Sequence, residues 1–121
     1  MNRKEFGRVV REVLQSLPEE FAVHVAGAEV VIEDEPTAHQ IRDAGLDPRE
    51  DTLFGLYEGV PIGDRHDGYA GLPDKISIFY LPIIEVCETP EEIREEIRTT
   101  ILHEVAHFFG IGDEDLDEWG Y

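Results

Sequence analysis

The stretch HEVAHFFGIGD, residues 103–113, decides both the fold and the chemistry that this sequence predicts. His103 and His107 stand four residues apart, so on a helix they lie one turn apart on the same face. Two imidazoles placed in this way can ligate one metal ion at about 2.0–2.1 Å. Glu104, on the flank of that face, can take a proton from a water without ligating the metal. We therefore expect a metal site with Glu104 as its catalytic base.

This stretch closes a long helix that we expect over residues 89–110. Thr89 suits the N-cap, Pro90 suits the first helical position, and Glu92 stands where a capping box requires an acid. Gly110 and Gly112 offer left-handed positions that end the helix. Helical spacing predicts an aliphatic stripe toward the core, formed by Ile93, Ile97, Ile101, Val105 and Phe108. It predicts a second, polar or small face toward a ligand cleft, formed by Glu96, Thr99, Thr100, His103, His107 and Gly110.

A third ligand has to come from beyond the helix. The turn at Gly110 can bring Asp113 back toward the metal, but spacing alone does not separate it from Glu114, Asp115, Asp117 and Glu118. The alternative is a structural site, in which one of those neighbouring acids is a fourth protein ligand and no coordination position is left for water. Two histidines and a carboxylate with open positions suit zinc and also iron. We expect zinc, with one ion per chain.

The sequence upstream predicts one more helix and a few strands. Apolar spacing from Phe6 to Leu17 predicts an N-terminal helix that ends at Pro18. A second short helix is possible over residues 19–27, a helical turn within 37–52, and another in the tail from 113 to 121. Strands are expected over residues 28–33, 53–60 and 75–81, with a hairpin connection over 63–73. Pro82 suggests that the third strand ends near an edge.

This order of elements predicts an α+β fold in a single domain, residues 1–121. Its small twisted mixed sheet of about three to four strands would pack on the N-terminal helix and on the C-terminal active-site helix. Cys87, the one cysteine, is expected to be buried. There is no apolar run long enough for a membrane span and no leader segment, so we expect a cytoplasmic protein that does not enter membranes.

The charge of the chain narrows the class of partner. There are 28 acidic and 10 basic residues, which gives a formal net charge of -18. Such a surface repels phosphate backbones, so nucleic acid is not expected as a partner. It favours cationic partners, and a basic peptide or flexible protein segment fits that preference.

With these residues in place, the motif resembles the extended zincin motif in which an aspartate is the third ligand. The rest of the chain is similar to short bacterial zincin-like metallopeptidases, through residues 31–36, 53–61, 72–76 and 110–116. The resemblance implies a zincin-like fold in which the active-site helix packs beneath the sheet. It also implies zinc held by His103, His107 and Asp113, with Glu104 as base. An edge strand, either Ile76 to Leu81 or the glycine-rich strand before it, would bind an extended peptide.

Two departures from the larger zincins shape the expected function. The only methionine is Met1, so the methionine-containing turn of metzincins is absent, and only residues 111–121 follow the helix. We expect a zinc-dependent metallopeptidase that hydrolyses peptide bonds. The alternative is a non-catalytic zincin-fold module that binds metal and a peptide or partner.

If the site is catalytic, a further group has to stabilise the oxyanion. Four side chains are candidates for this role: Tyr57, His66, Tyr80 and Tyr121.

Overall fold

The computed structural model describes residues 1–59 and 73–118. The elements of this part are α1 (Arg3–Gln15), α2 (Glu19–Val25), β1 (Ala28–Glu33), α3 (Ala38–Asp43), β2 (Gly55–Glu58), β3 (Asp74–Phe79), α4 (Tyr80–Val86), α5 (Pro90–Phe108) and α6 (Asp113–Glu118). The three strands form one mixed sheet in the order β1–β3–β2, in which β1 is parallel and β2 antiparallel to β3. The predicted α+β fold is therefore confirmed. The predicted hairpin connection lies almost wholly outside the described residues.

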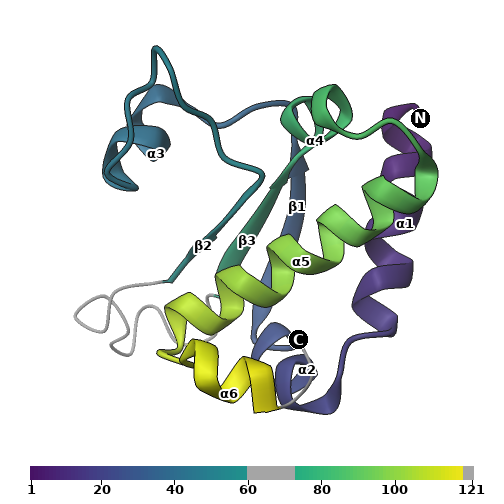
Figure 1. The fold of residues 1–121 in the computed structure, drawn as a ribbon, viewed down its shortest axis with the longest axis vertical. Coiled ribbons are helices and arrows are strands. Elements are labelled where there is room, and N and C mark those ends of the chain that lie inside the picture. The colour runs from purple at the N-terminus through teal and green to yellow at the C-terminus, as the bar shows by residue number, and fades with distance from the viewer. Residues whose placement is uncertain (60–72, 119–121) are drawn as a thin grey trace.

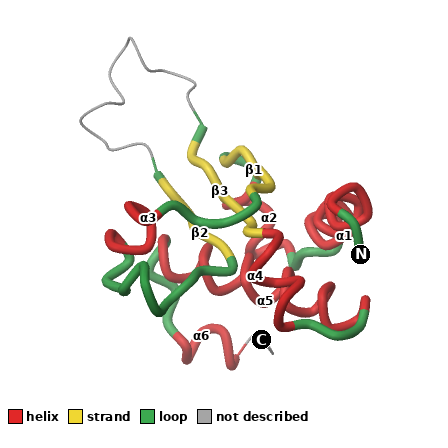
Figure 2. The backbone as a smooth tube through the Cα atoms, turned by 90° about the horizontal axis from the view of Figure 1, so that it is seen from above, coloured by secondary structure: helices red, strands yellow, loops and turns green. Residues whose placement is uncertain are grey.

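Helices α1 and α5 cover the same face of the sheet (Figures 1 and 2). The register places Val30 beside Ile76, and Gly55 beside Ile78, so these residues share that face. A core forms between the sheet and the two helices, with fully or almost fully buried side chains from all three: Phe6, Val10, Val13, Ile76, Ile78, Ile97, Ile101 and Val105. The α5 helix is thus fixed against the sheet by its apolar side, as its aliphatic stripe predicted.

Strand β3 lies in the middle of the sheet, so the predicted edge position of residues 75–81 is wrong. The strand ends at Phe79 and the chain continues directly into α4. Pro82 marks no edge, because it falls in the first turn of α4, where a helix needs no N–H donor. Ile76 to Leu81 cannot serve for strand addition, which leaves the glycine-rich strand β2 as the edge beside α5.

Helix α5 begins and ends as predicted. The side chain of Thr89 accepts a hydrogen bond from the N–H of Glu92 at 3.1 Å. At the other end Gly110 has φ +70°, and the Ile111 N–H donates to the carbonyl of Ala106 at 2.8 Å. This six-to-one bond with a left-handed glycine is a Schellman ending, which satisfies helix carbonyls and turns the chain away one turn after His107.

Several residues in and directly after α5 lie differently from the prediction. Glu96, Thr99 and Gly110, expected on the cleft face, do not line the groove that His103 and His107 line. Phe108, expected in the core stripe, is 44% exposed, and Thr100, expected on the cleft face, is buried. Both lie against β2: Thr100 packs on Gly55, and Phe108 covers Gly59. Helical spacing shows which residues share a face but not where a neighbouring strand ends, so it could not place either contact.

The short helices fill in segments that the sequence left undecided. Helix α2 forms within residues 19–27, α6 within the tail, and α3 within residues 37–52. Thr37 and Gln40 close a reciprocal capping box at the start of α3. Within residues 1–59 and 73–118, no helix has the length and apolarity needed to cross a membrane.

Gly55 offers a direct test of the packing between α5 and β2. A Cβ atom at this position would lie 2.5 Å from Thr100 Cγ2 and 3.0 Å from the carbonyl oxygen of Ser77. Overpacking of this kind typically costs about 1–3 kcal/mol, so we expect Gly55→Ala to lower the free energy of unfolding by about that amount. Urea unfolding measures it. Gly27→Ala is the control, since its Cβ would meet nothing closer than 3.8 Å; equal stability of the two variants would contradict the packing.

Candidate metal centre

The two predicted histidine ligands lie on one face of α5 near its C-terminal end. His103 and His107 are both exposed, and both line an open groove with a volume of about 770 Å³. Apolar side chains from several elements complete the groove: Leu46, Leu53, Leu56, Phe108, Ile111 and Leu116. Two accessible imidazoles one helical turn apart, at the wall of a groove, fit a divalent metal with room left for a ligand.

Glu104 lies between the histidines and strand β2. Its carboxylate Oε1 accepts a hydrogen bond from the backbone N–H of Tyr57 at 3.1 Å. Burial raises the pKa of the Glu104 carboxyl above its ordinary value, while the Tyr57 N–H, His107 and His103 act in the opposite direction. A carboxyl group whose proton affinity is increased by burial, within an open groove, suits proton transfer.

Helix α5 and strand β2 run side by side with matched spacing. Three contacts follow one another: Gly55 with Thr100, Tyr57 with Glu104, and Gly59 with Phe108. Each contact is two residues further along the strand and four further along the helix. These steps are about 6.7 Å and about 6 Å long, so the two repeats coincide over this length. Glycine at both ends lets the helix approach closely, and Glu104 falls in the middle of the contact.

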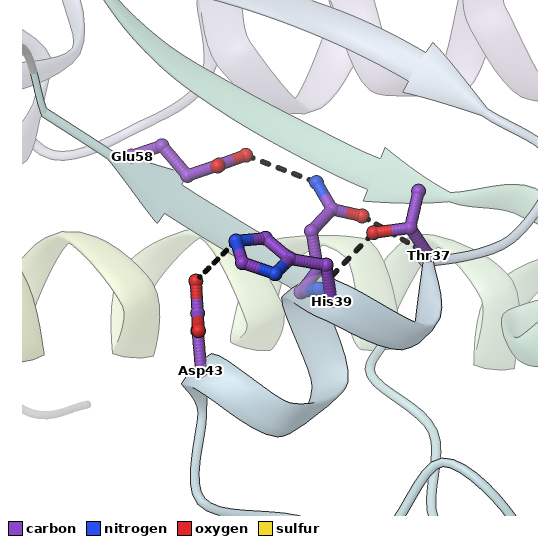
Figure 3. Close-up of polar contacts among 5 residues, drawn as sticks. Thr37, His39, Asp43 and Glu58 are labelled. Atoms are coloured by element: carbon purple, nitrogen blue, oxygen red, sulfur yellow. Dashed lines mark hydrogen bonds and ion pairs between the residues drawn. The ribbon is translucent and has the colours of Figure 1, made fainter.

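Helix α3 forms the opposite wall of the groove. The side-chain amide of Gln40 donates to Glu58 Oε1 at 3.0 Å, which ties α3 to β2. His39 Nε2 lies 3.0 Å from Asp43 Oδ2 on the same helix (Figure 3). Asp43, Glu58 and Glu104 all line the groove, and its described lining contains no lysine or arginine. The groove therefore combines apolar surface with acidic groups.

The predicted third ligand begins α6. Asp113 is the first residue of that helix, three residues beyond Gly110, but its side chain is not among those the structure describes. Among the described side chains, no three histidine, cysteine, aspartate or glutamate residues gather as a metal site. The alternative ligands are exposed on α6, and none joins the histidine pair in the described part of the chain: Glu114, Asp115, Asp117 and Glu118. Asp113 therefore stays a prediction.

The oxyanion candidates are reduced by the structure. The hydroxyl of Tyr80 donates to the carbonyl of Met1 at 2.6 Å, which is a structural contact. Tyr57 lines the groove, but its hydroxyl donates to Asp74 Oδ2 at 2.7 Å. His66 and Tyr121 lie outside the described residues. Asp74 was missed by sequence reasoning, and only its place at the start of an apolar strand could have drawn attention to it.

Comparisons with known proteins bear on the family and the fold of this chain. The profile of a family described as zincin-like metallopeptidase matches residues 25–121. A solved structure described as a conserved hypothetical protein from Thermo thermophilus is similar, with a TM-score of 0.61 and 22% sequence identity. The match covers 90% of this chain and 94% of that one, and at this identity it speaks for the fold alone. No curated protein matches the chain significantly.

Proposed function

This chain belongs to the zincin-like metallopeptidase family, and on that basis we propose that it hydrolyses peptide bonds with a bound zinc ion. In this proposal His103, His107 and Asp113 hold one zinc ion per chain, and Glu104 is the general base. The observation that carries it is the position of Glu104, held at the wall of the groove between the histidines and the edge strand. A purely structural metal site needs no such carboxylate. The cytoplasmic location expected from the sequence is part of the same proposal.

The donor set fits zinc. Two imidazoles and a carboxylate with an open position are the ligands of many catalytic zinc sites, and both histidines here are accessible from the groove. When bound, zinc supplies Lewis-acid chemistry, which makes a water easier to deprotonate and polarises a peptide carbonyl.

The protein's own contribution centres on Glu104. Its carboxylate takes one proton from the attacking water as the new carbon–oxygen bond forms. It then delivers that proton to the nitrogen of the leaving amine as the carbon–nitrogen bond breaks. The products are a carboxylic acid and an amine, and Glu104 returns to its ionised form. Burial, which raises the pKa of Glu104, favours the proton-holding stage of this cycle.

We propose an extended, basic peptide segment as the substrate. Strand β2 forms one wall of the groove, and a peptide can add to the outer side of this edge strand as a further strand. Of the backbone groups on that side, the Tyr57 N–H already donates to Glu104, so the peptide would use the others. A peptide placed there meets the Glu104 carboxylate beside Tyr57. The acidic groups Asp43 and Glu58 in the lining favour lysine or arginine in the peptide, and the net charge of -18 disfavours nucleic acid.

A second function remains a candidate because the groove is open and both histidines are exposed. An open groove excludes water poorly, whereas efficient hydrolysis gains from water exclusion. The non-catalytic alternative is a zincin-fold module that binds metal and a peptide or partner without cleaving it.

A peptide-library assay separates these two functions. The zinc-loaded full chain is incubated with unstructured peptides of varied sequence, and cleavage products are identified by mass spectrometry. We expect cleavage that a chelator abolishes and added zinc restores, with lower KM for basic than for matched acidic peptides. Because the preference is electrostatic, it should weaken as salt is raised. Binding of basic peptides without any cleavage would instead support the non-catalytic module.

A further inference from the structure

The backbone N–H of Tyr57 points toward helix α5 and not toward the neighbouring strand β3. The N–H of Phe79 donates to the carbonyl of Phe54 at 2.9 Å, which fixes the phase of the β2–β3 ladder. The backbone groups of residues 54, 56 and 58 therefore bond to β3, whereas those of residues 55 and 57 point away from it. The outward N–H of Tyr57 donates to Glu104. The proposed base, Glu104, is thus hydrogen-bonded to a backbone N–H of the edge strand β2.

The side chain of Tyr57 is held through its hydroxyl and through its ring, which also meets Phe109 edge-on with the centroids 5.5 Å apart. Its hydroxyl donates to Asp74 Oδ2 at 2.7 Å, and both residues are buried, with 7% and 8% of their surface exposed. Its ring stacks on Phe108, with the centroids 4.1 Å apart and the planes 25° from parallel. Phe108 directly follows His107 in the chain. The strand residue that holds Glu104 is therefore itself fixed to both the sheet and the active-site helix.

We propose that Tyr57 is a positioning residue, whose contacts with Asp74 and Phe108 fix the backbone N–H that orients Glu104. The kinetic consequence rests on the proposed peptidase function, whereas the anchoring of the carboxylate does not. A glutamate side chain has three rotatable bonds, and fixing one carboxylate oxygen removes most of its rotamers in advance. The other oxygen then remains for proton transfer. Without the anchor, a displacement of about 1 Å can cost about 10²-fold in rate.

A merely structural role for Tyr57 has a different signature. If the tyrosine only fills space, its variants lose stability over the whole sheet and leave the orientation of Glu104 unchanged. Two conservative variants distinguish the roles. Tyr57→Phe keeps the ring and its stacking but removes the bond to Asp74, and Asp74→Asn keeps an oxygen that can accept that bond.

Hydrogen exchange followed by NMR tests the anchor in the metal-free full chain. Glu104→Ala removes the acceptor, so protection of the residue 57 amide should fall by about tenfold or more, as for loss of one hydrogen bond to a charged group. Tyr57→Phe should give at least about a threefold loss at the same amide, and Asp74→Asn should stay within about twofold of wild type. The amide of Leu56, which bonds within the sheet, is the internal control.

Kinetics on a peptide found to be cleaved give the second readout. Tyr57→Phe should lower kcat about tenfold with KM within about twofold, whereas Asp74→Asn should retain most of the wild-type kcat. The proposal is overturned if Tyr57→Phe retains full protection of amide 57, or loses it only in parallel with Leu56. If the wild-type chain cleaves no peptide, the proposed function fails, and the exchange measurement still decides whether Tyr57 anchors Glu104.

Discussion

Replacing Glu104 by glutamine should lower kcat/KM for peptide hydrolysis by about 10²–10⁴-fold, the usual contribution of a general acid–base group. The glutamine oxygen can still accept the Tyr57 N–H, so the side chain should keep its place while losing the ability to take a proton. Zinc affinity should be unchanged, because in the proposed site Glu104 flanks the metal and does not ligate it. The two quantities are measured by peptide cleavage and by competition with a chromogenic chelator.

A matched control is available on the same helix. Glu95 is exposed on α5, and Glu95→Gln makes the same change in charge outside the groove lining. It should hydrolyse peptides at the wild-type rate. Hydrolysis by Glu104→Gln within a few-fold of wild type would remove Glu104 from the mechanism. Loss of zinc together with activity would instead make Glu104 a ligand, which the proposal does not allow.

Removal of either histidine should have the second large effect. His103→Ala and His107→Ala should each weaken zinc binding by at least about 100-fold. Loss of a residue that only hydrogen-bonds to a metal ligand already costs up to about 100-fold, and loss of the ligand itself should cost at least as much. At a zinc concentration of 100 times Kd, binding stabilises a folded protein by about 2.7 kcal/mol, so this zinc-dependent stabilisation should nearly vanish in both variants. Chelator competition and thermal unfolding with and without zinc measure these effects.

His39→Ala is the control for general loss of an exposed histidine. His39 lies on α3 and pairs with Asp43, but it does not line the groove. It should bind zinc as the wild type does. A chain as acidic as this one also attracts divalent cations nonspecifically, and that binding should be equal in all three variants. Wild-type affinity in His107→Ala would contradict the metal centre.

The parts of the fold that the sequence predicted are those set by local signals. Helix α5 was predicted from the N-cap at Thr89, the glycine at 110 and a four-residue apolar repeat, each of which acts within a few residues. The same geometry predicted that His103 and His107 would share a face. The central position of β3 was missed because sheet order depends on pairing between distant segments, and no local pattern encodes it.

The contacts around Glu104 could not be predicted from the sequence either, because they also join segments that are distant in the chain. Tyr57 is 47 residues from Glu104 and 17 residues from Asp74, so neither contact leaves a periodic trace. Pro82 misled because proline is equally compatible with a strand edge and with the first turn of a helix. Glycine within a strand allows either a bulge or a close backbone approach, and the structure shows that α5 approaches closely at both Gly55 and Gly59.

The central claim is that His103 and His107 hold a zinc ion that retains an open position beside Glu104. Zinc-edge X-ray absorption on the full chain with one equivalent of zinc tests it most directly. We expect two imidazole nitrogens at about 2.0–2.1 Å, carboxylate oxygen, and a further light-atom ligand that a zinc-binding hydroxamate displaces. A spectrum without imidazole, or a site closed by four protein ligands that hydroxamate leaves unchanged, would contradict it.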